Sequence, residues 1–138
     1  MTKEFLYSFI KQHRLTVISS INEALKPEAA LIGFAISEKL EIIFDTLSTS
    51  RKYKNISQNP NVALVIGWGD ETTVQYEGTA SQLAGPEDDQ YREIYYEVYS
   101  DGRDHAETWA GLVHFKVSPK WIRYSNFNEP VVIEEMAF

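Results

Sequence analysis

Two adjacent basic residues, Arg51 and Lys52, are the side chains whose position in this sequence most clearly suggests chemistry. They follow Thr49 and Ser50, either of which can cap a helix, and the helix is predicted to end at Asn59-Pro60-Asn61. A helix N-terminus carries a partial positive charge, so each cation in its first turn opposes the macrodipole by about 0.3 to 1 kcal/mol. A bound phosphate would reverse this cost, because backbone amides, cap hydroxyls and both cations would converge on it.

The charge balance of the chain favours this anion-site interpretation. The sequence has 13 basic and 20 acidic residues and a formal net charge of −7, and its densest basic cluster is Arg51, Lys52 and Lys54. A single basic cluster on an acidic domain is a more specific signal than the same cluster on a basic one. The alternative, that these three residues form a solvated face, remains open on spacing alone. We expect a small anion as the partner, and no nucleic acid.

Other reactive patterns are missing from the sequence. The three histidines, His13, His105 and His114, lack the spacing of metal ligands, so no metal site is expected. There is no cysteine, which excludes disulfides, thiolate metal sites and a cysteine nucleophile. A glycine-rich phosphate loop, a nucleophile elbow and a dinucleotide fingerprint are absent too, and no catalytic residue is identified. If the protein is an enzyme, a bound phosphate-bearing cofactor is expected to supply the reactivity.

The elements that must position the cations are mostly short strands. At 138 residues the chain is long enough for a single domain, residues 1–138. Short runs of apolar and β-branched residues predict strands over residues 15–20, 29–37, 41–46, 62–68, 73–83, 112–117 and 121–126. The first three are expected to form an antiparallel meander, and the last two a hairpin around residues 118–120. Gly78 is expected to mark a bulge or a close approach of the backbone.

Helical patterns are fewer. They cover residues 2–12, the segment after Ser50, and a tyrosine-rich stretch from Gly85 to near Tyr99, whereas residues 100–107 are predicted to be a polar loop. Six or seven strands with two or three helices and short turns favour a mainly β, α+β fold. The expected architecture is a closed or nearly closed antiparallel barrel decorated with helices.

The location of the protein is predicted from what the chain lacks. No apolar run approaches the length that crosses a bilayer. The first residues also lack the apolar core and cleavage site of a signal peptide. We therefore expect a cytoplasmic protein with no membrane partner.

One long motif resembles a known family. Residues 44–65, which contain F-D-T-x-x-x-S-R-K-x-x-N-I-x-x-N-P-N-V-A-L-V, resemble the core motif of the pyridoxamine 5′-phosphate oxidase-like family. Residues 74–80 and 115–124 are similar to that family's next strand and closing hairpin, so the likeness covers nearly the whole chain. The resemblance implies an antiparallel split β-barrel of six to seven strands that binds FMN, and a homodimer with the flavin at the subunit interface.

The resemblance also implies a set of cofactor-binding residues. Arg51 and Lys52 would grip the FMN phosphate, with Ser50 beside them. The further candidates are Phe44, Asp45 and Thr46 in the preceding strand, the main chain from Leu31 through Ile32 and Gly33 to Phe34, and Thr73 and Gln75 near the ring. An arginine is common in the family's second strand, but residues 29–33 contain none.

Two functions follow from this resemblance. Residues 131–138 are unlike the arginine- and histidine-containing segment that ends the oxidase proper, so a general-stress-protein-like member is expected. The first hypothesis is an FMN flavoprotein, an oxidoreductase that passes hydride or electrons between a reduced nicotinamide donor and an unknown small acceptor. The second is a non-catalytic protein of the same fold that stores or senses FMN, heme or a deazaflavin. Trp68, Trp109 and Trp121 are expected to pack, with an interface or ring contact as the alternative.

Overall fold

The computed structural model describes residues 1–138. Its eight strands are β1 (Leu15–Ile21), β2 (Pro27–Gly33), β3 (Ala35–Ile36), β4 (Ile42–Leu47), β5 (Asn61–Ile66), β6 (Thr72–Gln82), β7 (Leu112–Asn126) and β8 (Val132–Ala137). Its helices are α1 (Lys3–Lys11), α2 (Arg51–Gln58), α3 (Asp89–Val98), α4 (Gly102–Thr108) and the short 3₁₀ helix η1 (Pro86–Asp88).

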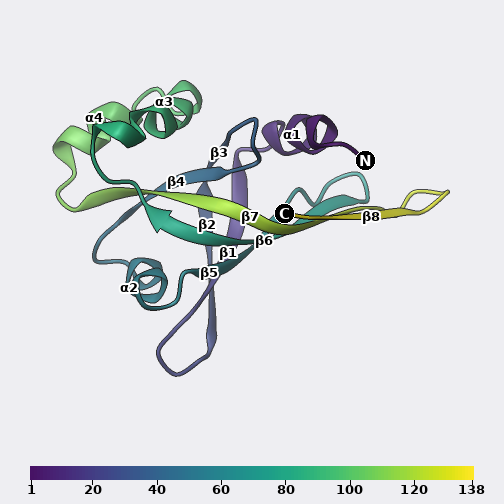
Figure 1. The fold of residues 1–138 in the computed structure, drawn as a ribbon, viewed down its shortest axis with the longest axis horizontal. Coiled ribbons are helices and arrows are strands. Elements are labelled where there is room, and N and C mark those ends of the chain that lie inside the picture. The colour runs from purple at the N-terminus through teal and green to yellow at the C-terminus, as the bar shows by residue number, and fades with distance from the viewer.

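All strands belong to one antiparallel sheet (Figure 1), in the order β2-β1-β5-β6-β7-β4-β3, with β8 paired to β7. The two outermost strands of this path, β2 and β3, are separated in the sequence by Phe34 alone. The sheet must therefore curl until its two edges meet near that buried residue. This confirms the predicted split β-barrel, with eight strands in place of six or seven.

A bulge between the two longest strands makes this curvature possible. The pairing register of β6 and β7 shifts beside Gly78, where β7 carries the extra residue Lys120. A Cβ on Gly78 would lie 2.5 Å from the carbonyl oxygen of Ser118, so only glycine allows this approach. Pro119 fits at the bulge because a ladder N–H is not required of it there. The predicted hairpin around residues 118–120 is therefore wrong, and β7 runs through as one strand.

Two other predictions on the strands need correction. The expected meander forms only in part: β1 pairs with β2 and β3 with β4, but β2 and β3 are separate strands at opposite edges of the sheet. Residues 29–37 divide at Phe34 because the chain passes there from one edge of the sheet to the other. The C-terminal strand β8 was not predicted, and it forms the true hairpin with β7.

The predicted polar loop at residues 100–107 is also wrong, because most of it is α4. Contacts with α3 stabilise this short helix, and the sequence of α4 has no hydrophobic periodicity that would predict it. Arg103 donates to both carboxylate oxygens of Glu93, at 2.7 and 2.9 Å, and its guanidinium lies 4.7 Å from the ring centroid of Tyr96. A helix of this length depends on tertiary contacts rather than on propensity.

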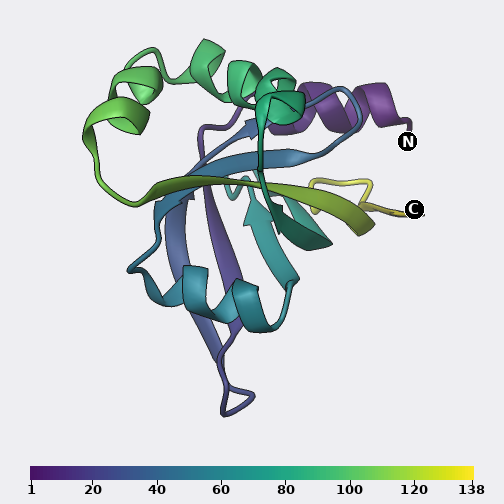
Figure 2. The same ribbon diagram turned by 60° about the vertical axis from the view of Figure 1, so that its left-hand side comes forward.

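The helices cover different parts of the sheet. α1 buries Leu6 and Ile10 in the core and is capped by Thr2, whose hydroxyl accepts from the amide of Phe5. Figure 2 shows α2 across the lower end of the sheet, and α1, α3 and α4 on the opposite side. None of the helices has both the length and the apolar character that a membrane span requires. The α2 end of the barrel is thus separate from the face that the other helices cover.

Candidate functional site

The hydroxyl of Ser50 links the end of β4 to the start of α2. It accepts a hydrogen bond from the amide of Tyr53 at 3.2 Å, so Ser50 and not Thr49 is the N-cap. Its oxygen also lies 2.9 Å from that of Thr46. The structure therefore brings the two predicted hydroxyl ligands together, directly before the two cations.

Lys52 lies in the first turn of α2 as a half-buried cation. It lines a cavity of about 100 Å³ together with Arg51, Ser20, Glu28, Ala29, Ala30 and Ile18. Lys52 takes part in none of the ion pairs of the structure. Burial lowers the pKa of Lys52, and the Asp45 carboxylate offsets this effect only in part. Lys52 is therefore a half-buried cation without an ion-pair partner at the start of α2.

Arg51 differs from its neighbour, because its side chain is 75% exposed and already paired. Its Nη1 donates to Oε2 of Glu28 at 3.2 Å. Asn55 donates to the other oxygen of that carboxylate at 2.8 Å, and Asn22 donates to Oε2 at 3.2 Å. A carboxylate thus lies in the predicted anion site.

Sequence reasoning missed Glu28. On β2 this residue shares the inward face with Ala30 and Ile32, because successive side chains of a strand point to opposite faces. Glu28 lies one residue before the predicted strand over residues 29–37, so the sequence pattern gave no signal for its inward position on β2, which begins at Pro27. The reason for its burial, the amides of Asn55 and Asn22, lies outside that strand.

The remaining predicted residues of β2 and β4 differ in how far a ligand could reach them. The side chains of Phe44 and Ile32 are buried in the core, so only their main chain is available to a ligand. Leu31 is 61% exposed on the outer face of the sheet. Gly33 lies against α3's C-cap residue, since a Cβ there would be 2.6 Å from the hydroxyl oxygen of Tyr99.

Asp45 faces a different neighbourhood, under α3. Its cross-strand partner on β7 is His114, which is buried and whose ring packs edge-on against Tyr95 and Tyr96 with centroids 5.5 and 5.7 Å apart. Burial lowers the pKa of His114, and its Nε2 has no hydrogen-bond partner. Burial, and to a smaller extent the Asp45 carboxylate, raises the pKa of Tyr95. The charge of Asp45 therefore acts on both Lys52 in α2 and Tyr95 in α3.

Thr73 and Gln75 lie on β6, away from the α2 cavity. A row of cross-strand partners on the outer face runs from Leu31 through Val17 and Val65 to Gln75. Three strand spacings of about 4.8 Å place Leu31 and Gln75 about 14 Å apart on this face. The hydroxyl of Thr73 is buried without a hydrogen-bond partner. Within one chain these two residues do not join Arg51 and Lys52.

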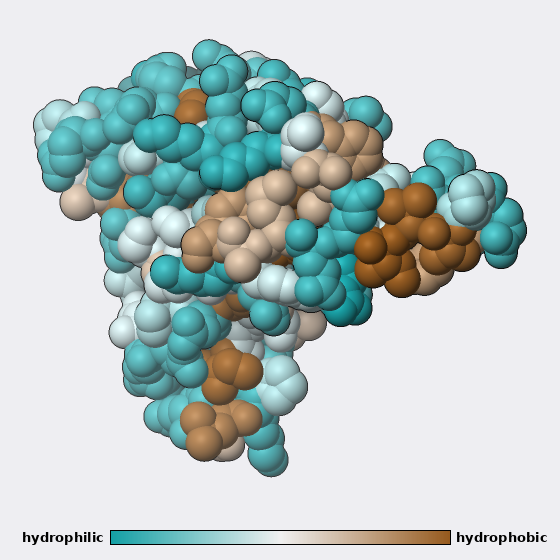
Figure 3. All heavy atoms as spheres, turned by 45° about the vertical axis from the view of Figure 1, so that its right-hand side comes forward, coloured by the Kyte–Doolittle hydropathy of each residue, from teal (hydrophilic) through white to brown (hydrophobic).

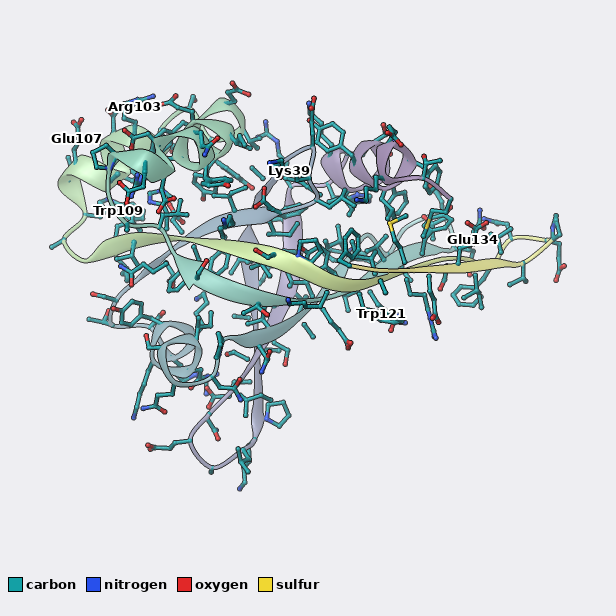
Figure 4. The ribbon with its side chains drawn as sticks, viewed as in Figure 1. Lys39, Arg103, Glu107, Trp109, Trp121 and Glu134 are labelled. Atoms are coloured by element: carbon teal, nitrogen blue, oxygen red, sulfur yellow. The ribbon has the colours of Figure 1, made fainter.

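A second, larger cavity of about 610 Å³ lies between α1, β3 and α3, on the side opposite α2. Its volume suits a small ligand, and its lining includes Arg14, Lys39, Phe34 and Tyr91. Figure 4 shows Lys39 between α1 and α3. Of the residues expected at the cofactor, only Phe34 lines this cavity.

The tryptophans lie apart from one another. Figure 4 shows Trp109 near α4 and Trp121 on β7, at well-separated positions. The ring of Trp109 stacks on His105 with centroids 4.0 Å apart, and the Nε1 of Trp121 lies 3.4 Å from a Glu135 oxygen. None of the three tryptophans lines the α2 cavity.

Comparisons with known proteins support the fold. The sequence model of the family described as Pyridoxamine 5′-phosphate oxidase matches residues 2–126. The chain is 31% identical over 90 residues to the pyridoxine/pyridoxamine 5′-phosphate oxidase of Ehrlichia ruminantium, a match that covers 64% of this chain and 46% of that protein. It therefore spans less than half the length of this curated relative.

Two solved structures show the same fold. General Stress Protein 26 from Bacillus anthracis is 24% identical to this chain and superimposes on it with a TM-score of 0.74. The superposition covers 99% of this chain and 98% of that one. A heme binding protein from Mycobacterium smegmatis is 10% identical to this chain and superimposes on it with a TM-score of 0.82. This superposition covers 99% of this chain and 58% of that one. At these identities the likeness establishes the fold alone.

Proposed function

Because the chain belongs to the pyridoxamine 5′-phosphate oxidase family, we propose that it is a flavoprotein that binds the FMN phosphate at the N-terminus of α2. The observation that carries this proposal is Lys52, a half-buried cation without an ion pair, next to Arg51. A partly desolvated ammonium group is stabilised by a nearby opposite charge. A phosphate in the cavity would provide that charge.

The groups at this end of the barrel suit a phosphate. Arg51 and Lys52 supply positive charge, and Thr46 and Ser50 supply hydroxyl groups. The amides of Arg51 and Lys52 have no intrahelical acceptor, because they belong to the first turn of a helix. Two features lower the positive charge of this site. On the inward face of β2, Ala30 stands where an arginine would add a second guanidinium group. The guanidinium of Arg51 is already paired with the carboxylate of Glu28. The residues therefore fit the group with a reduced positive charge.

The flavin ring and the subunit partner form the next part of the proposal. The main chain from Leu31 to Phe34 would border the ring, while Gln75 lies three strands away on the outer face. Leu31 and Val65 are exposed apolar residues on that face, at 61% and 42%. A homodimer that buries this face would let a second chain complete the ring site, and we propose this arrangement.

Bound FMN would supply the hydride or electron transfer, between a reduced nicotinamide donor and a small acceptor. The residues of this chain bind and orient the cofactor: the cations hold the phosphate, and the β2 main chain sets the position of the ring. The side chains of Ile32 and Phe44 are part of the core beneath these strands, which keeps this main chain rigid. This division of roles needs no nucleophile or general base from the chain.

The first test is retention of FMN by the purified protein. We expect the visible absorption of bound flavin to remain after excess FMN is removed by gel filtration. Arg51→Ala is expected to weaken FMN binding about tenfold or more, because a charge-assisted hydrogen bond contributes about 1.5 to 3 kcal/mol. Lys54→Ala is the matched control, since Lys54 lies on the same helix but pairs with Glu23 at 3.6 Å. If the Arg51/Lys52 double alanine variant binds FMN as tightly as the parent, the phosphate assignment is wrong.

Activity and cofactor identity need separate measurements. Protein-dependent oxidation of a reduced nicotinamide in the presence of FMN supports the oxidoreductase, whereas its absence with retained flavin supports a storage or sensing role. The heme-binding relative has the same fold, so heme is titrated in parallel. If the protein binds heme and does not retain flavin, heme and not FMN is the cofactor.

A further inference from the structure

A carboxylate lines the α2 cavity, the cavity of about 100 Å³ beside Arg51 and Lys52. Glu28 lines that cavity with Arg51 and Lys52, and its side chain is 21% exposed. The nearest cation is Arg51, whose Nη1 is 3.2 Å from the carboxylate. A site for a phosphate would be expected to lack such a group, because like charges disfavour one another.

Glu28 is the fixed member of the Arg51–Glu28 pair. Asn55, which is 4% exposed, donates to one oxygen of Glu28 and also to the hydroxyl of Ser20 at 3.0 Å. Asn22 donates to the second oxygen. Arg51 in contrast is 75% exposed and has no other partner. An arriving anion would therefore draw Arg51 away and leave Glu28 in place.

The charge of Glu28 does not depend on Arg51. Its pKa lies below the usual value of a glutamate mainly because of the hydrogen bonds from Asn55 and then Asn22, with Arg51 a smaller cause. The carboxylate therefore stays ionised at neutral pH when Arg51 turns to a ligand. It then faces the bound phosphate without its own counterion.

We propose that Glu28 is an internal counterion that competes with the cofactor phosphate for Arg51 and so weakens the binding of phosphate monoesters at this site. This inference deepens the proposed function and rests on it. The residues that line the cavity include two cations and one carboxylate, a formal sum of +1, so a phosphate dianion would make this sum negative. The penalty falls specifically on ligands that carry the phosphate.

The test compares Glu28→Gln with the parent. Glutamine keeps the length of the side chain and an oxygen that accepts from Asn55, but it removes the charge. We expect FMN to bind about tenfold more tightly to this variant, because one like charge beside the phosphate is lost. Riboflavin, which lacks the phosphate, is expected to bind both proteins equally.

Glu23→Gln is the matched control. It makes the same change in net charge, but Glu23 pairs with Lys54 outside the cavity and is 70% exposed. Its FMN affinity is expected to equal that of the parent. If Glu28→Gln does not fold, Glu28→Ala takes its place, with the same expectation.

The outcomes separate the two proposals. If the parent binds FMN and Glu28→Gln binds it equally or more weakly, the counterion role is wrong while the flavoprotein proposal stands. If neither protein binds FMN, the flavoprotein proposal fails, and thermal protection by inorganic phosphate tests Glu28 alone. A larger protection of Glu28→Gln than of the parent supports the counterion role, and equal or absent protection of both overturns it.

Discussion

At the scale of single residues, Ser50 serves both the fold and the proposed site. Its hydroxyl caps α2 through the amide of Tyr53 and contacts Thr46. The sequence left Thr49 and Ser50 as equal candidates for the cap. Only the backbone path from β4 into α2 selects Ser50, since its extended conformation turns the side chain back onto the helix.

Ser50→Ala is expected to lower the free energy of unfolding by about 1 kcal/mol, because the Tyr53 amide loses its acceptor. Urea denaturation measures this change. Thr49→Ala is the control, since Thr49 is exposed and is not the cap. An equal loss in both variants would contradict the assignment of the cap.

His114 gives the chain a pH dependence of stability. Burial holds its pKa below the ordinary value, with Asp45 raising it and Arg92 lowering it further. Between the folded-state pKa and the unfolded value of about 6.5, the unfolded chain binds the proton more strongly. The stability contribution of neutral His114 is therefore present above pH of about 6.5 and is lost as the pH falls below it.

His114→Gln is expected to flatten this dependence. Urea midpoints at about pH 7.5 and about pH 5.5 should differ less in the variant than in the parent, because the titrating group is gone. His105→Gln serves as the control, since His105 stacks on Trp109 near the surface. This variant is expected to show the same pH dependence of stability as the parent. If His105→Gln flattens the profile instead, the buried histidine is not its cause.

At the scale of elements, the β6–β7 bulge determines how the barrel is built. Gly78 allows the carbonyl of Ser118 to approach, and Pro119 lies where the ladder is interrupted. The sequence predicted a bulge or close approach at Gly78, which is confirmed, and it placed a hairpin turn at residues 118–120. A local pattern does not distinguish a break that reverses the chain from one that only bends it, so the predicted hairpin was wrong.

Gly78→Ala is expected to destabilise the fold by about 1 to 3 kcal/mol, because its Cβ would meet backbone and the side chain of Val117 at 2.5 and 2.8 Å. Gly69→Ala, in the turn between β5 and β6, is the control, since a Cβ there meets nothing within 4 Å. Thermal or urea unfolding compares the two variants. If both variants have the same free energy of unfolding, the strands can move apart at the bulge and the close approach at Gly78 is not required.

At the scale of the whole molecule, two apolar surfaces are exposed. One is the outer face of the sheet around Val65, and the other is the projecting end of the β7–β8 hairpin. Figure 3 shows the second as a hydrophobic patch, and its exposed residues are Phe127, Val131, Val132 and Ile133. The proposed flavin site needs the first surface to meet a second chain.

Val65→Glu is expected to convert a dimer into a monomer without unfolding the chain, because a charge would be buried at the interface and exposed in the monomer. Gel filtration with light scattering measures the mass against the 15.8 kDa of one chain. Ile133→Glu, on β8, is the control. If this variant and not Val65→Glu separates the subunits, the hairpin is the interface and the outer-face arrangement is wrong.

The sequence by itself determined the barrel, the helix that starts with two cations, and the family. These features depend on local patterns: alternation, cap residues and the motif at residues 44–65. Strand pairing could not be derived in the same way, since β4 pairs with β7, whose residues are more than 60 positions later in the chain. The short helix α4 and the strand β8 were missed because their partners stabilise them.

The cofactor site divides in the same manner. The sequence predicted Arg51, Lys52, Ser50 and Thr46 as neighbours because they are close along the chain. Only the tertiary structure brought Glu28 to Arg51, since a carboxylate 23 residues away reaches the cavity through strand pairing and two asparagine amides. The presence of an anion site is thus a local property, whereas its net charge depends on what the fold places opposite the cations.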